Sequence, residues 1–344
     1  MLSLLGLAST MGSPSPPPDP SRPHHGADGR FRNPNAIDEH RLIGFLKWQL
    51  GRGPRDETLR VPRAFRFPNT HEFAHNPGPT VTWVNHSTFL VTAEGVNFLT
   101  DPIWSDRCSP IQWAGPQRKH PPGVAFKDLP PIHHVVISHS HYDHLDADTV
   151  RRIGNRATWW VPLRLADWFH EQGITNVVEL DWWDSREAPG ASGSTVRVTS
   201  VPVQHFSGRT VFDRNTTLWT GWVVRIGGRQ FYFAGDTGYN PQDFRDTRRR
   251  LGPMDLSLIP IGAYSPRWFM KPVHVSPEEA VRIHEDLESR LSIGMHWRTF
   301  RLTAEPMHEP PYRLFLSLDQ RKIPHERFRV LDPGQRIAWG REPL

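Results

Sequence analysis

The sequence predicts an α/β protein whose β-sheets are covered by helices. From about residue 78 onward, short apolar segments of strand length alternate with segments that have helical periodicity. The first two predicted strands, over 81–91 and 96–101, are joined by Glu94-Gly95 and should form a hairpin. The 34 prolines among the 344 residues indicate many loops and argue against a helical bundle.

The chain divides into three regions. Residues 1–36 are expected to form a disordered arm, because 12–35 are rich in Pro, Ser and Gly. Residues 37–77 are expected to hold a short amphipathic helix over 37–50 and a linker. This helix is expected to pack against the main domain, and contact with a membrane surface is the alternative. Residues 78–344 form the main domain, and no internal repeat is visible in them.

Within the main domain, apolar segments predict strands and amphipathic segments predict helices. The clearest helix covers 276–291: Ser276 is a suitable N-cap, Pro277 suits the first turn, and Glu279 completes a capping box. Its expected apolar face is Ala280, Ile283, Leu287 and Leu291. The other predicted strands are 133–139, 195–203, 220–226, 229–236, 254–262 and 291–297, and the other predicted helices are 148–154, 164–173 and 241–252.

Composition limits the class of protein and the choice of partners. The net charge of +5 suits an anionic partner such as a phosphate, a lipid headgroup or a nucleic acid. The single cysteine, Cys108, excludes an internal disulfide framework and a cysteine-rich zinc site. No apolar run is long enough for a transmembrane helix, and the apolar start, 1–7, lacks the basic residues of a signal peptide. These features argue against secretion and favour a cytoplasmic or peripheral membrane location.

The segment 138–144 (SHSHYDH) offers four potential metal ligands within six residues: His139, His141, Asp143 and His144. Alternate residues of an extended segment point to the same side, so His139 and His141 can bind one metal. Asp143 and His144 can then face a second metal after the loop turns. Imidazole and carboxylate groups suit zinc, iron or manganese.

Three further ligands are expected at the ends of later strands: His205, Asp236 and His296. Active sites of layered α/β proteins commonly gather at such strand ends. A single histidine at a strand end is usually an ordinary loop residue, but a dense cluster followed by three such residues indicates a metal site. The histidines at 24, 25, 120, 133 and 134 are interpreted as ordinary loop or strand-edge residues.

The pattern H-x-H-x-D-H, followed by a His, an Asp within GDTG and a final His, resembles the metallo-β-lactamase superfamily over about residues 78–340. That resemblance implies an αββα sandwich with metals at one edge. Within the superfamily, the chain is most similar to the N-acyl-phosphatidylethanolamine-hydrolysing phospholipase D family. The segments that carry this similarity include VISHSHYDHLD, ELDWW, FAGDTGY, IPIGAYSPRWFMK and HVSPEEAVRIH. Two departures are Asn85, where glycine is expected, and the proline-rich arm.

The resemblance implies two divalent metal ions, expected to be zinc. His139, His141 and His205 would hold one metal, Asp143, His144 and His296 the other, and Asp236 would bridge them. It also implies that Tyr142 and His274 contact the substrate, with an anion favoured at the start of the helix after His274. Asp143, Asp236 and His274 are the expected catalytic residues. Asp101 and His86 are candidates for orienting the ligands.

The expected function is therefore a phosphodiesterase of phospholipase D type that converts N-acyl-phosphatidylethanolamine-like lipids to N-acylethanolamine and phosphatidic acid. Its partners would be a phospholipid substrate, a membrane surface and a second copy in a homodimer, without nucleic acid. Alternatives are a hydrolase of soluble phosphates or lactones, as in ascorbate-phosphate lactonases, a nuclease suggested only by the basic pI, and a non-enzymatic metal-binding module. Aromatic residues that could line an acyl groove are Trp104, Trp113, Trp182, Trp183, Trp268 and Phe269.

Overall fold

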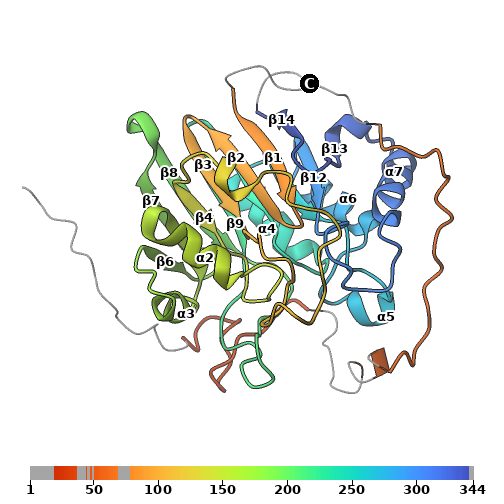
Figure 1. The fold of residues 1–344 in the computed structure, drawn as a ribbon, viewed down its shortest axis with the longest axis horizontal. Coiled ribbons are helices and arrows are strands. Elements are labelled where there is room, and N and C mark those ends of the chain that lie inside the picture. Colours follow the sequence, from red (N-terminus) through yellow and green to blue (C-terminus); the bar gives the residue numbers. More distant parts are fainter. Residues whose placement is uncertain (1–18, 37–43, 45–46, 49, 69–77, 341–344) are drawn as a thin grey trace, which may run out of the picture.

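The computed structural model describes residues 19–36, 44, 47–48, 50–68 and 78–340. In these residues, two seven-stranded mixed sheets pack face to face and helices cover their outer faces (Figure 1). This arrangement is the predicted αββα sandwich. The first sheet has the order β14 (Arg336–Ala338), β1 (Thr80–Asn85), β2 (Thr88–Ala93), β3 (Val96–Thr100), β4 (His134–Val136), β5 (Thr158–Pro162) and β6 (Val177–Leu180).

The second sheet is built from later parts of the chain and begins with antiparallel strands. Its strands β10 to β13 are parallel to one another, while β7, β8, β9 and β10 pair antiparallel. The order is β13 (Phe328–Arg329), β12 (Leu291–Met295), β11 (Leu256–Pro260), β10 (Arg229–Phe233), β9 (Gly221–Ile226), β8 (Thr195–Val201) and β7 (Ser185–Pro189).

Helices protect both outer faces. Helices α2 (Ala147–Ile153) and α3 (Ala166–Glu171) pack on the first sheet. Helices α4 (Pro241–Leu251), α6 (Pro277–Asp286) and α7 (Glu309–Arg321) pack on the second, and a short α5 (Arg267–Met270) precedes α6. Among the described residues, no helix is both long and apolar enough to cross a membrane.

Strands with apolar residues on both faces explain the layered core. In β4, Val135 packs toward α2 and α3, whereas Val136 packs into the core between the sheets. In β5, Trp159 likewise packs toward α2 and α3, and Trp160 packs into the core between the sheets. Successive side chains of a strand point to opposite faces, so continuous apolar runs are typical of strands buried on both sides.

The structure corrects the predicted start of the domain. The segment 81–91 is two strands rather than one, because the chain turns at His86-Ser87 and pairs β1 with β2. His86 adopts a left-handed backbone with φ 41°, which a continuous strand cannot contain. The predicted turn at Glu94-Gly95 does join β2 to β3. This extra hairpin carries His86 to the edge of the sandwich where the metal-ligand candidates gather.

Helix α6 forms as its sequence predicts, with one exception at its end. Ser276 caps the helix, and its side chain and that of Glu279 form the reciprocal bonds of a capping box. The helix ends at Asp286, so Leu291 belongs to β12 and not to the helix face. Of the helix predicted over 37–50, residues 44, 47 and 48 are described and helical, and most of the others lie outside the described residues.

The prediction of a disordered arm is wrong for residues 19–36, which pack against the domain; residues 1–18 lie outside the described residues. His24 and His25 are buried rather than ordinary loop histidines, and both contact the carboxylate of Asp181. Phe31 is buried among apolar side chains of the domain. Composition does not predict this packing, because a few specific contacts of His24, His25 and Phe31 hold an otherwise polar segment on the domain.

Candidate metal centre

The loop after β4 carries four of the predicted ligands. Strand β4 ends at Val136, and the chain passes through His139 to His141 before it turns. The backbone N–H groups of His144 and Leu145 both donate to the carbonyl oxygen of His141, which closes the turn. The loop therefore presents its side chains to two neighbouring places at one edge of the sandwich.

His139, His141 and His205 form the first cluster. Nε2 of His139 lies 2.8 Å from Nδ1 of His141, and Nε2 of His205 lies 3.3 Å from the same atom. Nδ1 of His205 donates a hydrogen bond to the carbonyl oxygen of Val273 at 2.9 Å. Because a carbonyl oxygen can only accept, the proton of His205 sits on Nδ1 and a lone pair on Nε2 faces the cluster. Metal-binding imidazoles are commonly oriented in this way.

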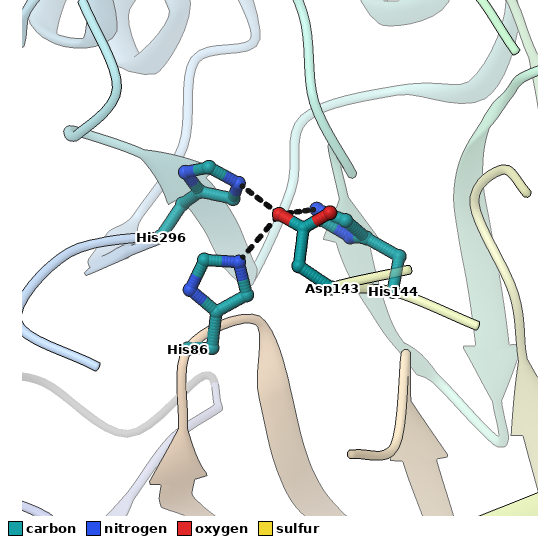
Figure 2. A group of neighbouring side chains, drawn as sticks. All are labelled: His86, Asp143, His144 and His296. Carbon is teal, nitrogen blue, oxygen red and sulfur yellow. Dashed lines mark hydrogen bonds and ion pairs between the residues drawn. The ribbon is translucent and has the colours of Figure 1, made fainter. Parts of the chain in front are cut away.

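Asp143, His144 and His296 form the second cluster. Oδ2 of Asp143 lies 3.3 Å from Nε2 of His144 and 3.2 Å from Nε2 of His296 (Figure 2). Nδ1 of His144 donates to Oδ2 of Asp101 at 2.6 Å. This bond occupies Nδ1, so Nε2 is the ring nitrogen of His144 that faces the carboxylate oxygens of the cluster.

Asp236 lies between the two clusters. Its Oδ2 is 3.2 Å from Nε2 of His144 and 3.1 Å from Nε2 of His296, on the side of the second cluster. The same oxygen is 3.9 Å from Nε2 of His139 and 3.8 Å from Nε2 of His205, on the side of the first. A single carboxylate oxygen is therefore within reach of both clusters, as a bridging ligand requires.

The donor atoms fit a pair of divalent cations. Among the described residues, Nε2 of His144 and Oδ1 of Asp236 are buried without a hydrogen-bond partner. Lone pairs of nitrogen and oxygen that face one another this closely repel unless a cation or proton lies between them. The donors are nitrogen and oxygen without a thiolate, which suits zinc, iron or manganese.

The electrostatics of the clusters also favour a cation. Burial would raise the pKa of Asp236, but the charges of His144 and His296 outweigh it and hold that pKa well below the usual value. Burial lowers the pKa of His296, yet the carboxylates of Asp236 and Asp143 more than compensate and raise it to about 9. The neighbouring carboxylates also raise the pKa of His144 well above its usual value, so a metal at the second cluster must displace protons from both His144 and His296.

His86 is part of the second cluster, although the sequence suggested it only as an orienting residue. Its Nε2 lies 2.9 Å from Oδ2 of Asp143 (Figure 2). His86, Asp101 and His296 have φ values of 41°, 33° and 62°. Non-glycine residues rarely adopt such left-handed conformations, and those that do cluster at functional sites. The contact of His86 with Asp143 depends on the β1–β2 turn, which the sequence patterns did not reveal.

His274 lies beside the predicted ligands. Its Nδ1 is 3.9 Å from Oδ2 of Asp236, and its ring centroid is 5.2 Å from that of His205. Burial lowers the pKa of His274 to about 3, so its imidazole is neutral at pH 7. At the start of α6, the capping box already satisfies the backbone N–H groups of Ser276 and Glu279.

The resemblance implied that Tyr142 contacts the substrate. Its hydroxyl donates to the carbonyl oxygen of Arg209 at 3.0 Å, and the guanidinium of Arg209 lies 4.0 Å from its ring centroid. The ring lines a polar cavity on the α2–α3 side together with Trp168. It does not line the cavity that the predicted ligands face, so direct contact with a substrate there would require the side chain to move.

A mostly apolar cavity of about 630 Å³ opens beside the two clusters. His141, Asp143, Asp236 and His274 belong to its lining. The apolar part of the lining comes from Trp48, Phe206, Val211, Phe269, Met270, Val273 and Leu302. The cavity thus joins a long apolar surface to the polar atoms of the candidate metal centre.

The prediction of which aromatic residues line a groove is correct only for Phe269. Trp182 is buried beneath the N-terminal segment, and Trp113 is 81% exposed on the surface. The other three, Trp104, Trp183 and Trp268, are not among the residues that line the cavity. Trp48 and Phe206 take their place, because the position of an aromatic side chain depends on how distant loops pack.

Comparisons with known proteins agree with this architecture. Residues 96–297 match the β-lactamase superfamily domain. A possible metal-dependent hydrolase from Veillonella parvula has a similar structure, with a TM-score of 0.58 at 17% identity, covering 76% of this chain and 99% of that one. A metallohydrolase from Ignicoccus hospitalis gives a TM-score of 0.56 at 22% identity, covering 75% of this chain and 97% of that one. These two structures support the fold.

Relatives found by sequence similarity indicate a narrower family than the structural neighbours do. N-acyl-phosphatidylethanolamine-hydrolyzing phospholipase D 1 of Caenorhabditis elegans is 44% identical over 274 residues, which covers 77% of this chain and 77% of the relative. The mitochondrial N-acyl-phosphatidylethanolamine-hydrolyzing phospholipase D of Saccharomyces cerevisiae is 33% identical over 68% of this chain and 50% of its own length.

Proposed function

Because the chain belongs to the β-lactamase superfamily and to its N-acyl-phosphatidylethanolamine-hydrolysing phospholipase D family, we propose that this metal-dependent hydrolase cleaves N-acyl-phosphatidylethanolamine-like lipids. Water would add to the phosphorus atom, and the bond from phosphorus to the ethanolamine oxygen would break. The products would be phosphatidic acid and an N-acylethanolamine, whose oxygen takes up a proton. Two divalent metals, proposed to be zinc, would serve the reaction.

The observation that carries this proposal is the junction of the apolar cavity with the candidate metal centre. A lipid phosphodiester has a charged phosphate beside long apolar chains. The cavity offers apolar side chains such as Phe269, Met270 and Leu302 in the same lining as Asp143 and Asp236. Burying acyl chains there would contribute about 25 cal/mol for each Å² of apolar surface removed from water. A small soluble phosphate or lactone would leave most of the apolar lining of the cavity without a contact.

The ligand set proposed for the two metals is that of the two clusters. His139, His141 and His205 would hold the first metal, Asp143, His144 and His296 the second, and Asp236 both. When bound, two such metals lower the pKa of a water molecule to near neutrality and stabilise negative charge on a phosphate.

One of the two carboxylates would accept the proton of the attacking water. Both Asp143 and Asp236 have pKa values held well below the usual range, despite burial that would raise them. Oδ1 of Asp236 has no hydrogen-bond partner among the described residues, so it is the atom we assign to receive the proton. Asp143 is the alternative acceptor on the side of the second cluster.

His274 would contact the substrate as a neutral imidazole. It lines the cavity beside Asp236, and a neutral ring can donate one hydrogen bond to a phosphate or carbonyl oxygen. Arg214 also lines the cavity and its guanidinium lies 4.2 Å from the ring centroid of Phe206, so it would add positive charge near the phosphate. Tyr142 would act indirectly, through its bond to Arg209.

A lipid surface is the proposed source of substrate. Val211 and Phe212 are 87% and 83% exposed, and Val211 also belongs to the cavity lining. Exposed apolar side chains at the rim of an apolar cavity suit peripheral contact with a membrane. A lipid could then pass from the bilayer to the cavity without exposing its chains to water.

The direct test compares turnover on a panel of substrates with one zinc-loaded preparation. Vesicles containing N-acyl-phosphatidylethanolamine should give phosphatidic acid and N-acylethanolamine in equal amounts. Vesicles of unacylated phosphatidylethanolamine, sugar phosphates, ascorbate-phosphate lactone and RNA should be turned over far more slowly. Faster turnover of a soluble substrate would contradict the lipid assignment, while loss of all activity after chelation is expected in either case.

A further inference from the structure

The segment 19–36, which sequence composition placed outside the fold, reaches the candidate metal centre. Its residues 25 and 31 form an antiparallel bridge, so the segment folds back on itself as a small hairpin. Phe31 is 3% exposed and packs against Trp182, Leu218 and Trp219 of the domain. The backbone N–H of Phe31 donates to the carbonyl oxygen of Asn215 at 2.8 Å, and the side chain of Asn215 donates back to Phe31 at 3.1 Å.

Asp181 anchors the start of this segment. Nη1 of Arg22 donates to its Oδ2 at 2.7 Å, and Nε2 of His24 and of His25 contact its two oxygens at 2.6 and 2.9 Å. Two histidines and a carboxylate could in principle hold a metal. However, Nδ1 of His25 accepts from the backbone N–H of Asp19, so its Nε2 carries the proton that bonds Asp181. With the guanidinium also present, this cluster is an anchor and not a cation site.

Beyond the anchor, the side chain of Asn33 bonds to both backbone groups of His205. Nδ2 of Asn33 donates to the carbonyl oxygen of His205 at 2.7 Å, and the backbone N–H of His205 donates to Oδ1 of Asn33 at 3.2 Å. Nε1 of Trp219 donates to the same Oδ1 at 3.1 Å, which fixes the orientation of the amide. An amide side chain thus pairs with the peptide groups of a proposed metal ligand 172 positions away in the sequence.

The remaining contacts of His205 show why this pairing matters. The residue is 1% exposed, so its backbone polar groups must be satisfied within the protein. Its ring is oriented by the hydrogen bond that Nδ1 donates to the carbonyl oxygen of Val273. The residue before it, Gln204, is bonded through its own backbone to Thr237 and Gly238. Asn33 therefore holds the backbone N–H and the carbonyl group of the residue that carries the proposed ligand.

We propose that Asn33 is a positioning residue of the metal centre, and that the segment 19–36 is a strap that fixes His205 for the first metal. This inference rests on the proposed ligand assignment, in which His205 serves the first cluster only. Groups that orient a metal ligand typically change metal affinity by about 10–100-fold when removed. The loss of Asn33 should therefore weaken one metal and spare the other.

The test measures zinc content after equilibration with graded concentrations of a chelator. Asn33→Ala removes both bonds to His205, and Asn33→Asp keeps the size of the side chain but places an oxygen against the carbonyl oxygen of His205. The matched control is Asn35→Ala, which lies on the same strap and loses only a 2.8 Å bond to Asp243 on α4. The full-length chain is used throughout, with the melting temperature of each variant recorded without metal.

Wild type and Asn35→Ala should hold two zinc ions over the same range of chelator. Both Asn33 variants should lose one zinc at a chelator concentration about 10–100-fold lower and keep the second. Retention of both zinc ions by the Asn33 variants would overturn the inference, and so would joint loss of both together with a lower melting temperature, which indicates general destabilisation. A wild type that takes up no zinc would instead refute the proposed metal centre, and the inference with it.

Discussion

Nδ1 of His144 donates a hydrogen bond to Oδ2 of Asp101 at 2.6 Å, between two side chains that are completely buried. This bond decides which nitrogen of His144 is free for a metal. Asp101 also accepts the backbone N–H of Ser138 at 2.7 Å, so one carboxylate fixes both the start of the loop 138–144 and the last proposed metal ligand in it.

Asp101→Asn should weaken the second metal. If the amide keeps its oxygen toward the backbone N–H of Ser138, it turns its NH₂ toward His144 and forces the imidazole proton onto Nε2, which faces the metal. We expect zinc affinity at this cluster to fall about 10–100-fold, measured by competition with a chelator. Asp243→Asn, at a buried aspartate of α4 that bonds Asn35 and Asn240, should leave the affinity near that of wild type. Equal loss in both variants would contradict the assignment.

Asp236→Ala and Asp143→Ala should differ in metal content. Asp236 lies within 4 Å of nitrogen atoms in both clusters, whereas Asp143 contacts only the second. Asp236→Ala should lower the affinity for both metals, and Asp143→Ala should leave about one zinc per chain. Elemental analysis after dialysis distinguishes the two outcomes. Unchanged zinc content in Asp236→Ala would exclude a bridging role.

His274→Ala should keep both metals and lose activity. His274 lines the cavity but is not among the seven proposed ligands, so turnover should fall by about 10² or more while zinc content stays near two. Tyr142→Phe is a useful comparison, because its hydroxyl bonds to Arg209 and its loss removes one neutral hydrogen bond worth about 0.5–1.5 kcal/mol. Loss of zinc in His274→Ala would make His274 a ligand or a structural support instead.

Zinc binding should release protons at neutral pH. The carboxylates of Asp236 and Asp143 overcome the effect of burial and raise the pKa of His296 to about 9, so His296 is protonated at pH 7. A metal needs the neutral imidazole, and zinc affinity should therefore rise with pH until about pH 9. Calorimetry in buffers with different enthalpies of ionisation would count the protons. No release at pH 7 would show that both His296 and His144, whose pKa the same carboxylates raise, are neutral before the metal binds.

Val211→Ser combined with Phe212→Ser should reduce binding to lipid vesicles. The two side chains are 87% and 83% exposed, so replacing them removes apolar surface at little cost to the core. We expect weaker co-sedimentation with vesicles and slower turnover of vesicle substrate, with near-normal turnover of a short-chain soluble analogue. Trp113→Ser, an 81% exposed residue outside the cavity lining, is the matched control. An equal effect of both changes would argue against a specific lipid-contacting loop.

The sequence alone determined the layers of the fold and most of the elements around the site. Strands such as β4 and β12 are short apolar runs, and the start of α6 is predicted by Ser276, Pro277 and Glu279. Such signals are local, because strand alternation and helix capping depend on residues a few positions apart. The dense motif from His139 to His144 and the later residues at strand ends also predicted which side chains would meet, and the structure brings all seven together.

Only the tertiary structure decided how that cluster is supported and what it faces. The contact of His86 with Asp143 requires a turn in what looks like one continuous strand, and the cavity joins residues as distant as Trp48 and Leu302. The bonds from Asn33 to His205 span 172 positions, within a segment whose composition indicates disorder. Such pairings depend on shape and on single hydrogen bonds between distant elements. Composition and periodicity report only local preference, so they carry no information about these contacts.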